Sequence, residues 1–393
     1  GLMELAAEFP LRRYNFNPGT LGTPARATRR AIAIFEEETE GWPIEAYRRG
    51  RLMLAAARRQ AIALWGNDQL AIGPGTTLWC NLLLDALAGH RRRERVGALK
   101  VLTTGHEHDG GAGALEHHPD LIVSYVGDTH LLDPDDFGRQ VALHSPEVVF
   151  LSQVTWTEGR QLPVRELIAE VRRRAPDAWV ILDAAQAVGL CAPILGIADF
   201  TVASGHKWLN GPAGTGFCWL GPRPIQELGG LFFVGHSLDE SWALRRFEPG
   251  GGQDFSRFAG LEAALSLYAQ VGVEGAQSRS RRLANHFARG LHQVFTHHKV
   301  PHSYFDGSGW VQEVPALPSG TCVVRFPLDF DPYPLYARLD SRAVHMKCIK
   351  GKTGTGEPLN QLRFGLPWFE QEERLDTALG IIDYTLAEGG GNV

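Results

Sequence analysis

Six short runs of apolar and β-branched residues recur through the first two thirds of the chain. They are 101–104 (VLTT), 121–126 (LIVSYV), 148–154 (VVFLSQV), 179–184 (WVILDA), 199–204 (DFTVAS) and 216–221 (GFCWLG). Most lack polar alternation, which is typical of strands that are covered on both faces of a sheet. Helical spacing of apolar residues over 76–92 and 163–176 separates several of them. This alternation predicts an α/β layer fold with a mostly parallel sheet.

The last third of the chain has a different order of predicted helices and strands. Apolar residues at helical spacing over 257–295 indicate one long helix or two consecutive helices. Strand patterns at 321–328 and 362–369 follow, and a helical pattern at 371–388 ends the series. This order predicts a smaller α+β domain that begins between residues 255 and 270. We therefore divide the chain into an N-terminal arm (1–22), a large domain (23–257) and a small domain (258–393).

Composition excludes several classes of function. The chain has 393 residues and a net charge of −5, whereas a dedicated nucleic-acid binder would carry a basic surface. No apolar run is long enough to cross a bilayer, and the first residues lack the pattern of a secretory signal. The five cysteines are odd in number and widely spaced, so we expect neither a disulfide framework nor a metal site. We expect a cytoplasmic protein without nucleic-acid or membrane partners.

Polar residues follow several of the predicted strands at the point where each strand ends. They are Lys207 after 199–204, Asp183 after 179–182, Thr155 after 148–154, His106 and His108 after 101–104, and Thr76 and Thr77 after LAIGPG. Ligands of open α/β sheets bind at the carboxyl ends of the strands. If the strands are parallel, these side chains meet at one edge of the sheet.

Lys207 is unusual in a chain that has only six lysines against thirty-three arginines. It lies in ASGHKWLNGPAGTGF (203–217), and a desolvated lysine there can form a Schiff base with a carbonyl. Pyridoxal phosphate enzymes need such a lysine and an acidic partner for the pyridinium nitrogen. Asp183 supplies the carboxylate, and Gln186 can donate to the phenolic oxygen of the ring. The plainer alternatives are a solvated surface lysine and an aspartate that caps a helix.

Phosphate binding requires donors at the start of a helix. GPGTTLWCN (73–81) offers the hydroxyls and amides of Thr76 and Thr77, although the same pattern also suits a plain N-cap. Ser204 and His206 can reach the phosphate from the other side. His108 is the candidate for covering the face of the ring, with His106 as the second choice.

These motifs together resemble one family. SGHKWLNGPAGTGF, LDAAQAVG, GTTLWCN and GHEHD are similar to the lysine, aspartate, phosphate and stacking-histidine motifs of class V aminotransferases. That fold type I family includes cysteine desulfurases, isopenicillin N epimerase-like enzymes and kynureninases. The resemblance implies a large domain with a mostly parallel seven-stranded sheet, a smaller C-terminal α+β domain, and a homodimer with active sites between subunits. It also implies that Lys207 forms the internal aldimine and acts as the base at Cα.

The resemblance extends to the residues expected to contact substrate and the neighbouring subunit. QLRFGLPWF is similar to the motif whose arginine, here Arg363, binds the substrate carboxylate, and NFNPGTLGTP brings Asn17 to the same site. Trp156 stands where desulfurases carry an asparagine, and kynureninases carry an aromatic residue near there. The threonine that reaches the phosphate of a neighbouring subunit is replaced by Gly251 or Gly252. We assign that contact to Gly252, with the Gln253 side chain or a backbone amide as substitutes.

Several reactions are compatible with these residues. We favour cleavage of the Cβ–S bond of an S-substituted cysteine through a quinonoid, in specialised metabolism. A transaminase, a decarboxylation-coupled oxidative deaminase, an epimerase and a non-catalytic scaffold are the alternatives. Cys348 between Lys347 and Lys350 can be a reactive thiol or an incidental cysteine, and the lysines at 347–352 are a solvated loop or bind an anionic group. Trp42, Trp156 and His236 indicate room for a large substrate, if they line the site.

Overall fold

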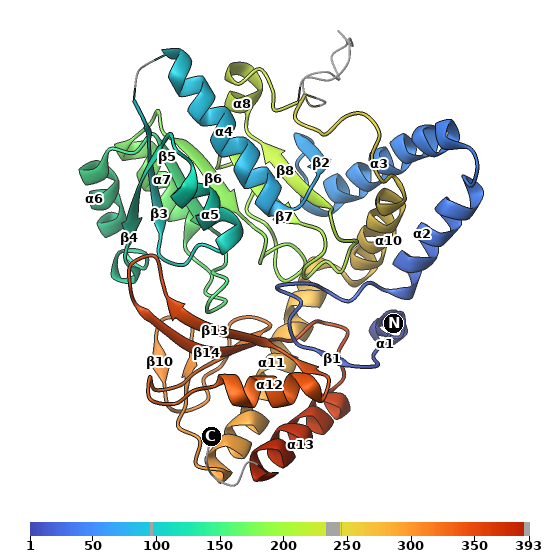
Figure 1. The fold of residues 1–393 in the computed structure, drawn as a ribbon, viewed down its shortest axis with the longest axis vertical. Coiled ribbons are helices and arrows are strands. Elements are labelled where there is room, and N and C mark those ends of the chain that lie inside the picture. Colours follow the sequence, from blue (N-terminus) through green and yellow to red (C-terminus); the bar gives the residue numbers. More distant parts are fainter. Residues whose placement is uncertain (95–96, 233–243, 245, 389–393) are drawn as a thin grey trace.

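The computed structural model describes residues 1–94, 97–232, 244 and 246–388. His236 therefore lies outside the described residues. A seven-stranded sheet forms the centre of the upper half of the molecule (Figure 1). In spatial order, its strands are β2 (Leu70–Gly73), β8 (Gly216–Leu220), β7 (Phe200–Ser204), β6 (Trp179–Asp183), β5 (Val148–Ser152), β3 (Leu99–Thr104) and β4 (Leu121–Val126).

The sheet is mostly parallel, as predicted. Only β8 pairs antiparallel with its neighbours β7 and β2, and the pairs from β7 to β4 are parallel. The carboxyl ends of β3, β5, β6 and β7 consequently meet at one edge. Strand β4 lies at the end of the sheet and is less covered than the others, with Ile122 57% exposed.

Helices cover both faces of this sheet, which explains the continuous apolar strands. Val148 and Phe150 of β5 pack with α4 and α5, whereas Val149 and Leu151 pack with α6 and α7. Successive residues of a strand point to opposite faces, so both sets must be apolar. The helices are α2 (Arg26–Glu38), α3 (Pro43–Trp65), α4 (Thr76–Glu94), α5 (Asp109–His117), α6 (Pro134–His144), α7 (Val164–Arg174) and α8 (Pro222–Glu227), with the 3-10 helix η1 (Asp128–His130).

The predicted helical stretch 257–295 forms two helices. They are α10 (Ser256–Val271) and α11 (Val273–His297), and Gly272 between them has a φ of +76°. Helix α10 packs against α2 and α3, whereas α11 packs against α13 (Glu372–Glu388). The division of the chain at residue 257 stays a prediction.

A second sheet and three helices form the C-terminal half. The strand order is β10 (Trp310–Val311), β9 (Ser303–Phe305), β11 (Thr321–Arg325), β14 (Pro358–Gly365) and β13 (Lys347–Lys352). Helices α11, α12 (Tyr333–Ser341) and α13 accompany this sheet, and a core around Leu283, Phe287 and Leu291 joins α11 to it. The lysines at 347–352 thus belong to a strand, because their backbone pairs with β14, and the predicted solvated loop is wrong.

The N-terminal segment bridges the two halves of the molecule. After α1 (Leu2–Ala6), strand β1 (Tyr14–Asn15) pairs with β12 (Val344–His345) of the C-terminal half. The Gly22 amide then donates to the His206 carbonyl at 2.7 Å, beside Lys207. A Cβ on Gly22 would lie 2.1 Å from the Lys207 carbonyl oxygen, so only glycine permits this approach. None of the described helices is both long and apolar enough to cross a membrane.

The core of the C-terminal half depends on buried leucines of α11. Leu291 is fully buried on α11, whereas Leu328 is 72% exposed. Leu291→Ala should lower the free energy of unfolding by about 2–5 kcal/mol because it leaves a cavity, and Leu328→Ala should change it by less than about 0.5 kcal/mol. Urea denaturation followed by tryptophan fluorescence measures both. Equal effects of the two substitutions would contradict the described core.

Candidate active site

The ends of the central strands surround a cavity of about 380 Å³. Gly19, Thr20, Gly75, Leu78, Asn81, Gly110 and Gly111 line it together with seven predicted site residues. Those seven are Thr76, Thr77, His108, Asp183, Ser204, His206 and Lys207. The sequence-based grouping of these strand-end residues is therefore confirmed as a spatial grouping, while their individual roles stay predictions.

Lys207 and Asp183 are the amine and the carboxyl group that line the cavity. Asp183 ends β6, and Lys207 lies in the turn after the adjacent strand β7. Burial lowers the pKa of the Lys207 ammonium from its usual range, while the Asp183 carboxylate opposes that shift. Burial likewise raises the pKa of Asp183, against the effect of Lys207 and of the Ala185 amide, which donates to Oδ1 at 2.7 Å. The environment thus favours an uncharged lysine, which is the nucleophilic form.

Four other lining residues, Gly75, Thr76, Ser204 and His206, form a group that is suited to an anion. The Thr76 amide at the start of α4 donates to Ser204 Oγ at 3.0 Å, and the two hydroxyl oxygens lie 2.9 Å apart. His206 Nδ1 is buried without a hydrogen-bond partner in the described part of the chain. A Cβ on Gly75 would lie 3.0 Å from the His206 ring, so the glycine keeps this space open. An unpartnered donor beside a helix N-terminus fits a phosphate group.

His108 caps helix α5 and faces the same cavity. Its Nδ1 accepts a hydrogen bond from the Gly110 amide at 3.0 Å. Burial, Lys207 and Arg363 lower the pKa of His108 to about 4, so the imidazole is neutral at physiological pH. A neutral ring suits stacking on a cofactor ring. His106 does not line the cavity, because it is buried in contact with Thr157 Oγ1 and Asp128 Oδ1.

Arg363 lies on β14 with 4% of its surface exposed. Its Nη1 donates to the Trp156 carbonyl, and its Nη2 donates to Asn17 Oδ1 at 3.3 Å. Burial lowers the pKa of the guanidinium to about 10, and among the described residues no carboxylate pairs with it. A buried guanidinium without an acidic partner is suited to the α-carboxylate of an amino acid. Asn17 and Trp156 thus contact Arg363, and the role of these three residues in binding substrate stays a prediction.

Three other predicted residues are absent from the lining of the cavity. Gln186 donates to the Gly19 carbonyl at 2.9 Å and accepts from Trp208 Nε1 at 2.9 Å, so its amide holds the N-terminal segment. Its donation to a cofactor oxygen stays a prediction. Thr155 does not line the cavity, and its hydroxyl accepts from the Arg160 amide at 3.1 Å. Gly252 is exposed, and a Cβ added to it would meet no described atom within 4 Å, so its contact to a neighbouring subunit also stays a prediction.

The sequence reasoning missed Glu107, which immediately precedes His108. Its carboxylate is buried and accepts from Thr104 Oγ1 at 2.8 Å and from Ser152 Oγ at 2.6 Å. Burial raises the pKa of Glu107 to about 7, and Asp183 contributes in the same direction. The available signal was a carboxylate between two strand-end histidines in GHEHD.

Cys348 has few properties of a reactive thiol. It is half-buried on β13, and burial raises the pKa of the thiol despite the neighbouring Lys347 and Lys350. Lys350 Nζ instead pairs with Asp331 at 2.7 Å. The suggestion that the lysines activate this thiol is therefore wrong, since desolvation outweighs their charge.

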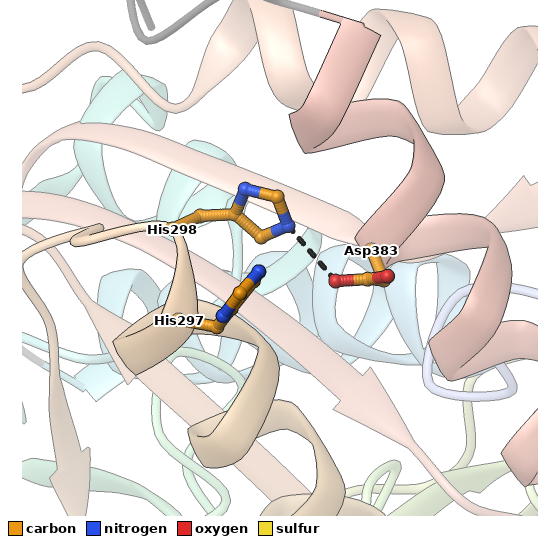
Figure 2. Close-up of side chains that lie close together, drawn as sticks. All are labelled: His297, His298 and Asp383. Atoms are coloured by element: carbon orange, nitrogen blue, oxygen red, sulfur yellow. Dashed lines mark hydrogen bonds and ion pairs between the residues drawn. The ribbon is translucent and has the colours of Figure 1, made fainter.

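Within the described ranges, two groups of side chains have metal-binding residue types, although no metal site is predicted. His297 ends α11, and His298 follows it beside Asp383 of α13. His298 Nε2 is hydrogen-bonded to Asp383 Oδ1 at 2.8 Å, and Figure 2 shows the three side chains together. His106 and Asp128 lie near Glu357, but Arg160 also contacts Asp128, and its charge opposes a cation there. In each group one histidine is already paired with the aspartate.

The sequence model of the aminotransferase class-V family matches residues 75–301, which is more than half of the chain. The chain belongs to this family. Class-V aminotransferases are pyridoxal-phosphate-dependent enzymes, and this protein is one of them. The residues fit that cofactor, because a lysine, a buried aspartate and an unpartnered histidine nitrogen line the same cavity.

This class-V enzyme is similar to proteins with several different activities. It is 26% identical over 310 residues to isopenicillin N epimerase of Streptomyces clavuligerus, covering 70% of this chain and 74% of that protein. It is 30% identical over 182 residues to kynureninase of Deinococcus radiodurans, covering 43% and 44% of the two chains. A probable cysteine desulfurase of Xylella fastidiosa is 26% identical over 271 residues, 61% of this chain and 60% of the other.

Solved structures establish the fold of the class-V enzyme. The cystine C-S lyase C-DES, in complex with cysteine persulfide, matches with a TM-score of 0.77 and 18% identity over 95% of this chain and 98% of its own. The cysteine desulfurase of Thermococcus onnurineus NA1 matches with a TM-score of 0.78 and 17% identity over 98% of each chain. The predicted fold type I architecture is confirmed.

Arg363→Gln tests the predicted carboxylate clamp. The substitution should raise the Kd for α-amino acids by about ten- to a hundredfold, because a charge-assisted contact is lost. Ligand-induced changes in the absorbance of the bound cofactor measure this Kd. Primary amines without a carboxylate are the matched control, and their Kd should change little. An equal loss for amines and amino acids would contradict the clamp.

Glu107→Gln tests the buried carboxyl group. Its pKa is raised from about 4.5 to about 7, so the folded protein keeps a proton that the unfolded chain releases. This contribution to stability is present below pH 4.5 and is lost as the pH rises through about 7. The stability of Glu107→Gln relative to the unsubstituted protein should therefore increase over this interval, by on the order of 2–3 kcal/mol. Denaturation curves at several pH values measure the difference in the free energy of unfolding between the two proteins. A difference that does not change with pH would contradict the raised pKa of Glu107.

Proposed function

We propose that this class-V enzyme is a lyase that cleaves the Cβ–S bond of an S-substituted cysteine in specialised metabolism. The bound cofactor supplies an electron sink that stabilises negative charge at Cα. Arg363 would hold the substrate carboxylate, Asp183 would keep the pyridine nitrogen protonated, and Lys207 would accept the Cα proton. The electron pair of the Cβ–S bond would leave with sulfur, and the rest of the substrate would yield pyruvate and ammonia after hydrolysis.

The observation that carries this proposal is the set of titratable groups in the cavity. Among its described lining residues these are Asp183, His108, His206 and Lys207. Burial, Lys207 and Arg363 lower the pKa of His108 to about 4, so its imidazole is a poor proton donor near neutral pH, and His206 is assigned to the phosphate. Lys207 therefore supports a reaction that needs only the removal of one proton from Cα. It supports less well a reaction in which a second residue must also donate a proton. A thiolate suits this site because thiols are acidic enough to leave without being protonated.

Epimerisation is the second candidate, because an isopenicillin N epimerase is 26% identical over 310 residues. It requires a proton to return to the opposite face of Cα. The low pKa of His108 argues against that residue as the donor. Transamination and decarboxylation-coupled oxidative deamination would also begin at Lys207 and are outcomes of the experiment below, as is a scaffold without activity.

A homodimer in a reducing cytoplasm is part of the proposal. Apolar side chains on α2 and α3 are exposed in the single chain, among them Ile34, Trp42, Ile44 and Leu52. Such a surface supports contact with a second subunit. All five cysteines are free, and four of them are buried, which is compatible with a reducing environment. Trp42 is 68% exposed and does not line the cavity of this subunit.

A comparison of S-ethyl-L-cysteine with O-ethyl-L-serine tests the reaction. The cofactor-loaded enzyme should release thiol, pyruvate and ammonia in equal amounts from the cysteine derivative, and react at least about a hundredfold more slowly with the serine ether, whose alkoxide leaves poorly. Lys207→Ala should abolish product release from both compounds.

The other reactions have distinct signatures in the same experiment. Conversion of the cofactor to its amine form indicates transamination, and loss of optical activity without thiol release indicates epimerisation. Carbon dioxide release that depends on oxygen indicates oxidative deamination. Any of these without thiol release would overturn the proposed lyase, and a protein that takes up no cofactor would overturn the enzyme assignment.

A further inference from the structure

A second and larger cavity lies beside the candidate active site. Its volume is about 750 Å³, and it lies between the N-terminal segment, the start of α2, and α12 with β12. Thr20 lines this cavity as well as the one that contains Lys207. The two cavities therefore share Thr20 as a lining residue, and Asn17 and Gly19 beside it line one cavity each.

This segment also contacts the carboxylate clamp. Asn17 lines the larger cavity, and its Oδ1 accepts from Arg363 Nη2 at 3.3 Å. Thr20 Oγ1 donates to the same oxygen at 3.0 Å. One residue thus separates the guanidinium of Arg363 from the larger cavity, so a substrate held at Arg363 lies close to it.

Positive charge dominates the lining of the larger cavity. Its charged lining residues are Arg12, Arg13, Arg26, Arg29 and Asp340, a formal charge of +3 from four arginines and one aspartate. The whole chain, by contrast, carries −5. Asp340 is already paired with His345 Nδ1. Arg26 donates to the Ala7 carbonyl, and in the described part of the chain no carboxylate pairs with Arg12, Arg13 or Arg29.

We propose that this arginine-lined cavity binds a second acidic group of the substrate, a carboxylate carried by the substituent on sulfur. The inference rests on the proposed function, since it specifies the substrate class for that site. Guanidinium groups bind carboxylates through two parallel hydrogen bonds, which gives orientation as well as attraction. An amino acid with one carboxylate at Arg363 and another at Arg13 or Arg29 would be held at both ends. Neutral S-alkyl cysteines would lack the second contact.

Two substrates of equal chain length test this inference. S-carboxypropyl-L-cysteine carries the second carboxylate, and S-butyl-L-cysteine has a methyl group in its place. The initial change in cofactor absorbance after mixing gives the Kd of each with the cofactor-loaded enzyme. The carboxylated compound should bind at least about fivefold more tightly, and this ratio should decrease at high salt because the arginines are exposed.

Two variants test whether the tighter binding of the carboxylated compound depends on Arg13 and Arg29. Arg13→Gln combined with Arg29→Gln should bring the ratio of the two Kd values close to one. Arg30→Gln is the matched control, because Arg30 follows Arg29 on α2 but pairs with Glu8 and does not line the cavity. It should retain the ratio. Circular dichroism and cofactor absorbance establish that each variant is folded and loaded.

The outcomes separate this inference from the proposed reaction. Equal Kd values in the unsubstituted enzyme would overturn the second acidic site, as would an unchanged ratio in the double variant. An equal loss in Arg30→Gln would assign the effect to general charge and also overturn it. If neither compound releases thiol but the ratio and its loss are observed, the acidic site stands and the lyase reaction fails. If thiol is released but the two Kd values are equal, the lyase reaction stands and the acidic site fails.

Discussion

The structure depends on the burial of two opposite charges at the ends of adjacent strands. Lys207 is 8% exposed and Asp183 is 6% exposed, so neither has the hydration that a free charge requires. Desolvation opposes the charged form of each, and their mutual attraction opposes desolvation. Both residues are fixed because β6 and β7 are parallel neighbours within a sheet covered on both sides. The α/β layers thus hold the Lys207 amine at the wall of the cavity with little of its surface exposed.

A second constraint joins the halves of the molecule through the loop at 154–161. The bridge between Val154 and Gln161 closes this loop. Gln361 Nε2 of β14 donates to the Thr157 carbonyl at 2.6 Å, and Arg363 donates to the Trp156 carbonyl. The Trp156 ring also meets His108 edge to face, with centroids 5.3 Å apart. Residues that hold the substrate and residues that face the cofactor cavity are consequently positioned by one loop.

Much of the fold and of the cavity was predictable from sequence, because the signals are local. Strands covered on both faces are continuously apolar, and residues such as Asp183 and Lys207 mark where they end. The reversed direction of β8 has no local signal, and the lysines at 347–352 look like a loop because their strand is stabilised by backbone pairing with β14. Glu107 was missed because its partners, Thr104 and Ser152, are brought together by folding. The arginine-lined cavity combines residues from the two ends of the chain, which no local pattern reveals.

The close approach of Gly22 to Lys207 has a mechanical consequence. Residues 14–15 are paired to β12, and seven residues later the Gly22 amide is bonded to the turn that carries the lysine. The N-terminal segment is therefore a short tether between β12 and the turn that carries the reactive amine. A movement of β12 would act on that turn through this segment. The absorbance of the bound cofactor would then respond to a movement in the C-terminal half of the protein.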